Sequence, residues 1–91
     1  MREVDFVVKI LRNARLNKGI THSQLSSSLH THATTISKLE KGVYHLRLTM
    51  FFRICEILGL EPSEVIKEAR FEYGFYKAQL NSQLKEQERQ Q

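Results

Sequence analysis

The side chains most capable of chemistry in this 91-residue sequence are four histidines, one cysteine and a run of hydroxyl groups. His30 and His32 are two residues apart, yet no second cysteine or carboxylate cluster lies at the spacing that a metal site needs. Hydroxyls gather between Ser23 and Thr35, but no histidine with a paired acid completes a catalytic triad, and no glycine-rich phosphate loop is present. The sequence therefore predicts no enzyme, no metal and no cofactor.

The single cysteine and the N-terminal residues indicate the cellular compartment in which the protein is expected. Cys55 is the sole cysteine and has no partner for an internal disulfide, so we expect a small buried side chain and not a redox sensor. Arg2, Glu3 and Asp5 interrupt any apolar signal segment, and no apolar run approaches the roughly 18 to 20 residues that cross a bilayer. We expect a cytoplasmic protein with no membrane segment.

Positive charge is concentrated in the first two thirds of the chain. Lys and Arg outnumber Asp and Glu by nine to four in residues 1–58, whereas residues 59–91 hold five against six. This asymmetry predicts an anionic partner for the N-terminal part. Nucleic acid is favoured over a membrane surface because no basic amphipathic segment is rich in lipid-facing aromatics.

The spacing of apolar residues predicts an all-α chain. Helices are expected over residues 6–17, 22–29, 33–40, 48–58 and from 62 toward 88. Asp5 and Thr21 are the expected N-caps of the first two helices, and Pro62 begins the last one. Because helices this short are marginal alone in water, they must dock on a shared core.

One apolar stripe is well defined in the fourth predicted helix. Five residues recur at the spacing of a single helical face, which predicts that all five lie in the core: Leu48, Phe51, Ile54, Cys55 and Leu58.

Two short helices joined by a tight turn on a basic background are the sequence form of a helix-turn-helix. The run Gly-Ile-Thr-His-Ser-Gln-Leu at 19–25 and the run Thr-Thr-Ile-Ser-Lys-Leu-Glu-Lys-Gly at 34–42 resemble the lambda-repressor-like, or Cro/XRE, family of DNA-binding proteins. The resemblance covers about residues 7–66. It implies a five-helix lambda-repressor-like domain over residues 1–68, and we expect a C-terminal helical extension over 69–91 with a frayed end.

The resemblance also implies which residues meet double-stranded DNA. Base contacts are expected from the exposed side of the third helix, by His32, Ala33, Thr34, Ser37 and Lys38. Phosphate contacts are expected from the start of the second helix and from the loop after the third, by His22, Lys41, Tyr44, His45 and Arg47. Lysine and threonine can read guanine and thymine edges, but few of these side chains distinguish one base pair from another. DNA shape and dimer spacing must therefore add specificity.

Some positions are structural or depart from the family pattern. Arg15 and Glu40 match positions that form a partly buried ion pair in some family members. Ser26 replaces a common alanine and can bond back to a helix carbonyl, whereas His30 replaces the usual turn glycine and has to accept a positive φ. Arg47 stands where a capping Ser or Thr is common.

The C-terminal segment is too aromatic for a solvated tail. Core or dimer packing is favoured over base stacking because the segment is acidic, and we expect a homodimer interface formed by Phe71, Tyr73, Tyr76 and Leu80. The resulting hypothesis is a repressor that binds a near-palindromic operator as a homodimer. The alternative is an antitoxin that binds a toxin through its C-terminal segment and autoregulates its operon.

Overall fold

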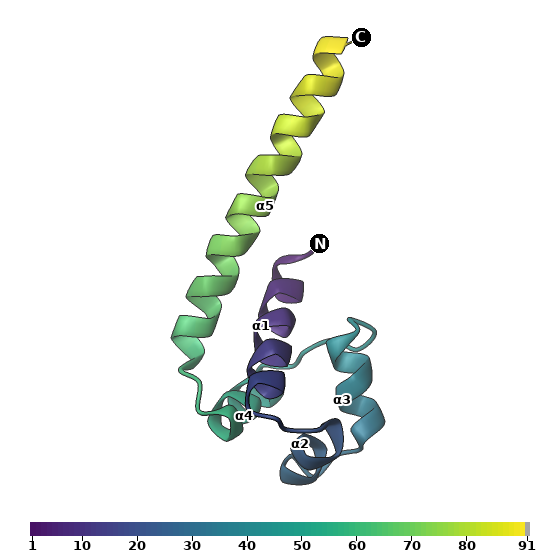
Figure 1. The fold of residues 1–91 in the computed structure, drawn as a ribbon, viewed down its shortest axis with the longest axis vertical. Helices are drawn as coiled ribbons and strands as arrows, with labels where there is room; N and C mark the ends of the chain where they lie inside the picture. Colours follow the sequence, from purple (N-terminus) through teal and green to yellow (C-terminus); the bar gives the residue numbers. More distant parts are fainter. Residues whose placement is uncertain (91) are drawn as a thin grey trace.

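The computed structural model describes residues 1–90, with side chains described for residues 1–87, and it confirms an all-helical chain of five helices (Figure 1). The helices are α1 (Glu3–Asn17), α2 (His22–Ser28), α3 (Ala33–Glu40), α4 (Leu48–Leu58) and α5 (Pro62–Gln90). None of these helices is both long and apolar enough to span a bilayer. In Figure 1, α1 stands between the long α5 and the short α3, and it contacts both.

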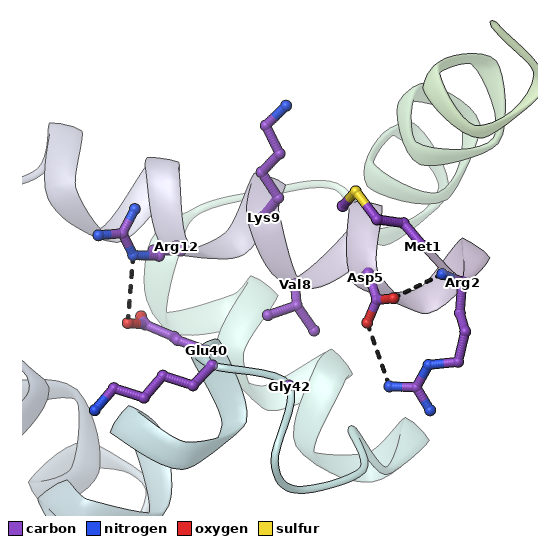
Figure 2. A pocket seen from close by; sticks show the side chains of 9 residues that line it. Met1, Arg2, Asp5, Val8, Lys9, Arg12, Glu40 and Gly42 are labelled. Carbon is purple, nitrogen blue, oxygen red and sulfur yellow. Dashed lines mark hydrogen bonds and ion pairs between the residues drawn. The ribbon is translucent and has the colours of Figure 1, made fainter. Parts of the chain in front are cut away.

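Helix α1 begins three residues earlier than predicted, and Asp5 is not its N-cap. Arg2 holds that position, and its backbone N–H donates to Asp5 Oδ2 at 2.7 Å (Figure 2). The Asp5 carboxylate therefore caps from inside the first turn, where acidic side chains also favour the positive end of the helix dipole. The same hydrogen bond holds the pKa of Asp5 below its usual value. The prediction failed because a carboxylate can stabilise a helix start in two ways: as the N-cap it accepts from an N–H of the first turn, and from inside the first turn it accepts from the N–H of the N-cap residue.

Helix α2 begins as predicted. Thr21 Oγ1 accepts from the backbone N–H of Gln24 at 3.1 Å, and the Gln24 side chain accepts from Thr21 N–H at 2.9 Å. Ser26 Oγ donates to the carbonyl of Ser23 at 2.9 Å, and His30 adopts a φ of 54°, so both expectations for these two departures are confirmed. The reciprocal cap satisfies two orphan groups of a helix of only seven residues.

The core lies where α1, α2, α3, α4 and the first turns of α5 meet. Cys55 and Leu58 have no exposed surface and Ile36 has 1%, so the expected burial of the cysteine is confirmed. Removal from water raises the pKa of the Cys55 thiol, which keeps it protonated and unreactive. The core also includes Leu25, Leu29 and Leu39 from the segment that spans α2 and α3.

Leu48 is the exception to the predicted core stripe of α4. Its exposed fraction is 65%, whereas Phe51 one turn later is 3% exposed. Leu48 lies in the first helical turn, where α1 and α5 leave an open apolar groove that it lines together with Ile66. Periodicity predicts the face on which a residue lies, but only the neighbouring helices decide how far along that face the core extends.

Helix α5 runs from the core into an arm that carries the chain to its longest dimension of 54 Å (Figure 1). Its first half packs on α1, where the Phe6 ring lies 6.0 Å from the Tyr73 ring and 5.8 Å from the Tyr76 ring. The N-terminal amine of Met1 donates to the Tyr76 hydroxyl at 2.9 Å. The helix continues to Gln90, beyond the expected end at 88, while Gln91 lies outside the described residues. Fraying of residues 83–91 stays a prediction.

Candidate nucleic-acid interface

The turn between α2 and α3 fixes the angle between these helices. The backbone N–H of Thr31 donates to the carbonyl of Ser26 at 2.9 Å, while His30 takes the left-handed conformation that reverses the chain. Leu25 of α2 and Leu29, the C-cap of that helix, pack in one core with Ile36 of α3. The result is a rigid pair of short helices, as the helix-turn-helix motif requires.

Helix α3 has one buried side and one open side. Ile36 and Leu39 face the core at 1% and 7% exposure. The residues expected to read bases lie on the other side of the helix or at its start: His32, Thr34 and Lys38 are exposed, and Ala33 and Ser37 are half-buried. His32 occupies the N-cap, but its side chain makes no capping hydrogen bond. Helix α1 lies between α3 and α5 and contacts both (Figure 1).

The loop after α3 folds back onto Lys38. Gly42 adopts a φ of 78°, which turns the chain so that Val43 N–H donates to the Lys38 carbonyl at 2.9 Å. The same turn brings in Tyr44, whose hydroxyl accepts from Lys38 Nζ at 3.4 Å and whose ring centroid lies 5.2 Å from that nitrogen. A residue expected to read bases and one expected to contact phosphate therefore touch each other.

The rest of this loop is open and basic. Lys41, Tyr44, His45 and Arg47 are all exposed. Arg47 is the N-cap of α4, and its side chain makes no hydrogen bond to the start of that helix. A cavity of about 490 Å³ separates the loop from α3, and Thr35 and Met50 contribute to its walls. The loop thus forms a cationic edge beside the open side of α3.

Arg15 and Glu40 lie together in the interior beside this surface. Arg15 Nε donates to Glu40 Oε1 at 2.6 Å and Arg15 Nη2 to Glu40 Oε2 at 3.0 Å, while Arg15 Nη1 donates to the carbonyl of Ile20 at 2.7 Å. The Arg15 side chain is only 7% exposed. The bidentate pair therefore ties α1 to the C-terminus of α3.

His22 belongs to the same cluster, which sequence reasoning missed. Its Nε2 lies 2.7 Å from Glu40 Oε2, so the ring that was expected at a phosphate is directed at a carboxylate. Burial by itself would raise the pKa of Glu40, but hydrogen bonds and charges from Arg15 and His22 outweigh it and hold that pKa below its usual value. The only sequence signal was a titratable ring at the start of the second helix, and its partner Glu40 lies 18 residues away along the chain.

The four residues expected at a dimer interface do not share one face. Tyr73 and Tyr76 are half-buried against Phe6. Phe71 is 77% exposed and lies on another side of α5, one turn from Phe75, which is 62% exposed. Leu80, at 42%, lies beyond the two tyrosines. Phe75 is the residue that the predicted set omitted, although its spacing of four from Phe71 places both on one helical face.

Among the described side chains, no three of His, Cys, Asp and Glu gather closely enough to hold a metal ion.

A family model described as Helix-turn-helix matches residues 11–65, which is more than half of the chain. Among solved structures, the chain is similar to the clp gene regulator ClgR from Corynebacterium glutamicum, with a TM-score of 0.77 and 23% identity over 89% of this chain and 86% of that one. No curated protein sequence matches it. The chain therefore belongs to the lambda-repressor-like (Cro/XRE) helix-turn-helix family of DNA-binding transcription regulators.

Proposed function

We propose that the protein represses transcription by occupying a near-palindromic operator as a homodimer, with α3 of each copy in the major groove. The observation that carries the proposal is the open side of α3, which lies opposite its core side and beside the cationic loop 41–47. A helix presented in this way offers polar side chains to base edges while neighbouring cations bind the backbone. In this proposal residues 1–68 read DNA and residues 69–91 assemble the dimer.

Base reading is assigned to His32, Ala33, Thr34, Ser37 and Lys38. The Lys38 ammonium suits guanine O6 and N7, and the Thr34 side chain suits a thymine methyl or a hydrogen bond. Two or three such contacts specify few base pairs. A second half-site about 34 Å away, read by a second copy, supplies the missing specificity.

Phosphate binding is assigned to His22, Lys41, Tyr44, His45 and Arg47. Four of these residues lie on one exposed loop, which supports a shared role along one strand of the backbone. His22 lies in the first turn of α2, and 37% of its side chain is exposed even while it contacts Glu40. A protonated ring can bridge the Glu40 carboxylate and a phosphate at the same time, because both ring nitrogens then donate.

Assembly through α5 is supported by the two exposed phenylalanines. Phe71 and Phe75 are large apolar side chains on a helix that no other element of the described chain covers beyond Tyr76. Exposed aromatic pairs at this spacing are typical of helix-to-helix interfaces. The same observation favours a second candidate function, in which this face binds a different protein, as in an antitoxin.

Two measurements test the proposal. Selection of bound duplexes from a random pool should recover a near-palindrome, and a set of selected duplexes without shared sequence would overturn sequence-specific binding. Sedimentation of the purified full chain should give a dimer. A monomer that becomes a complex only when a second protein is co-expressed would favour the antitoxin function.

A further inference from the structure

A polar cavity of about 590 Å³ opens between α1 and the end of α3, and we call it the α1–α3 cleft (Figure 2). Its α1 side is formed by residues spaced three and four apart, which places them on one face of the helix: Asp5, Val8, Lys9 and Arg12. Its other side is formed by Glu40 and Lys41. The cleft carries both acidic and basic side chains, so its affinity for an anion or a cation depends on which of these side chains are already paired.

Both carboxylates of the cleft are engaged within the chain. Asp5 accepts from the Arg2 backbone at 2.7 Å and lies 3.3 Å from the Arg2 guanidinium. Glu40 accepts from Arg15 through both oxygens and lies 2.7 Å from His22. Asp5 is therefore paired with Arg2, and Glu40 is paired with Arg15 and His22. Neither acid needs a further cation of the cleft as its counter-ion.

The other cations of the cleft are Lys9, Arg12 and Lys41, and of these only Arg12 has an ion pair among the described side chains. Arg12 Nε reaches Glu40 Oε2 only at 4.0 Å, a longer contact than those of Arg15 and His22, and half of its side chain is exposed. Figure 2 shows Lys9 and Arg12 one turn apart on α1, with Arg12 directed toward Glu40 and Lys9 away from it. The cleft thus has a surplus of positive charge around its opening.

The α1–α3 cleft adjoins the candidate DNA surface. Lys41 belongs both to the cleft and to the loop expected on the phosphate backbone. We propose that the cleft is a phosphate-binding site, and that in the operator complex its ligand is a backbone phosphate outside the bases read by α3. The proposal rests on the proposed DNA-binding function. Lys9 and Arg12 both line the α1 side of the cleft, and this combination suits a phosphodiester, because the guanidinium is a planar fork of donors and the ammonium is a compact charge on a flexible side chain that can turn toward the ligand.

The test compares two pairs of neutralising substitutions in the full-length protein. The cleft pair is Lys9→Gln with Arg12→Gln, and the matched control pair is Lys67→Gln with Arg53→Gln, which removes the same charges from exposed positions on α5 and α4. Binding to a selected duplex is measured over a range of salt concentrations. The cleft pair should reduce the slope of log affinity against log salt by about 0.9 for each lost phosphate contact, and the control pair should leave it unchanged.

Two further arms identify the source of the phosphate. A duplex trimmed to the bases read by α3 should abolish the difference between the cleft pair and the unsubstituted protein, because the flanking phosphates are then absent. Inorganic phosphate is titrated into labelled protein without DNA and followed by backbone amide NMR. Saturable shifts at Lys9, Arg12 and Lys41 that vanish in the cleft pair support the phosphate site with a free phosphate as its source.

The outcomes separate this inference from the proposed function. If the unsubstituted protein binds no duplex but phosphate shifts the cleft amides, the proposed function fails and the phosphate site stands. If the protein binds duplexes, the two pairs show equal salt slopes and phosphate shifts no cleft amide, the α1–α3 cleft is not a phosphate site.

Discussion

Arg15 and Glu40, 25 residues apart in sequence, meet in two hydrogen bonds of 2.6 and 3.0 Å between α1 and the last residue of α3. The pair holds the end of α3 against α1. Because Glu40 also lies 2.7 Å from His22 at the start of α2, one carboxylate joins three helices. This ion cluster therefore adds to the core packing that sets the orientation of α3.

Replacing Glu40 by alanine should destabilise the fold by about 3 to 5 kcal/mol, because it leaves the buried Arg15 guanidinium without its carboxylate. Chemical denaturation followed by circular dichroism measures the change in the free energy of unfolding. Glu56→Ala on the exposed side of α4 is the control and should change it by less than about 0.5 kcal/mol. Equal effects of the two substitutions would show that the pair has no structural role.

Stability should fall at acidic pH through the same carboxylate. The pKa of Glu40 is lower in the folded protein than its ordinary value of 4.5, so the unfolded chain binds the proton more readily and acid favours unfolding. The contribution of ionised Glu40 to the free energy of unfolding is fully present at pH values above 4.5, and it is lost as the pH falls through the pKa of Glu40 in the folded protein. Thermal melts between pH 3 and 6 measure it. The Glu40→Gln variant should lose less stability over this range, and a parallel pH dependence in both proteins would contradict the assignment.

Substitutions on α3 and on the loop should affect DNA binding differently. Lys38→Ala should relax preference at one base position by about 1 to 3 kcal/mol, since it removes a base contact. Arg47→Ala should weaken binding to every duplex alike and lower the salt slope by about one, since it removes a phosphate contact. Binding assays on the selected duplex and its single-base variants measure both effects. A uniform loss in both variants would contradict the groove assignment.

Tyr44 should influence the base preference of Lys38 as well as the backbone contact. Its hydroxyl and ring both lie against Lys38 Nζ, so Tyr44→Leu frees the ammonium and should reduce discrimination at the base that Lys38 reads. Tyr44→Phe keeps the ring and should retain most of that discrimination. The comparison is made on a Lys38→Ala background as well, where neither substitution should change base preference. Discrimination lost equally on both backgrounds would show that Tyr44 acts independently of Lys38.

Charge placed on the exposed aromatic face of α5 should dissociate the proposed dimer. Phe71→Glu with Phe75→Glu introduces carboxylates where an interface would exclude water, and both side chains are exposed in the single chain, so the fold should persist. Analytical ultracentrifugation of the full-length variant should show a monomer with unchanged helicity. Lys85→Glu, farther along the same helix, is the control for added charge. A dimer that survives the double substitution would place the interface elsewhere, and the groove lined by Leu48 and Ile66 is then the next surface to test.

Local sequence signals predicted the helices well, since each depends on neighbours within four residues. Thr21 with Gln24 formed the expected cap, and His30 took the positive φ that its place in the turn required. Asp5 was placed at the wrong position because a carboxylate can satisfy the same helix start from N-cap or from the first turn. Leu48 was placed in the core because periodicity carries no information on where a neighbouring helix ends.

The sequence by itself determined the helix-turn-helix, its polar and apolar sides, and the basic character of the first 58 residues, because hydrophobic period, capping and charge are properties of short segments. Only the tertiary structure decided that His22 faces Glu40, that Tyr44 holds Lys38, and that Tyr76 packs against Phe6 while Phe71 stays exposed. These relationships depend on how α2 and α5 pack against the rest of the chain and on how the loop after α3 folds back, which packing angles between helices control. Such angles depend on the whole core and on no single segment.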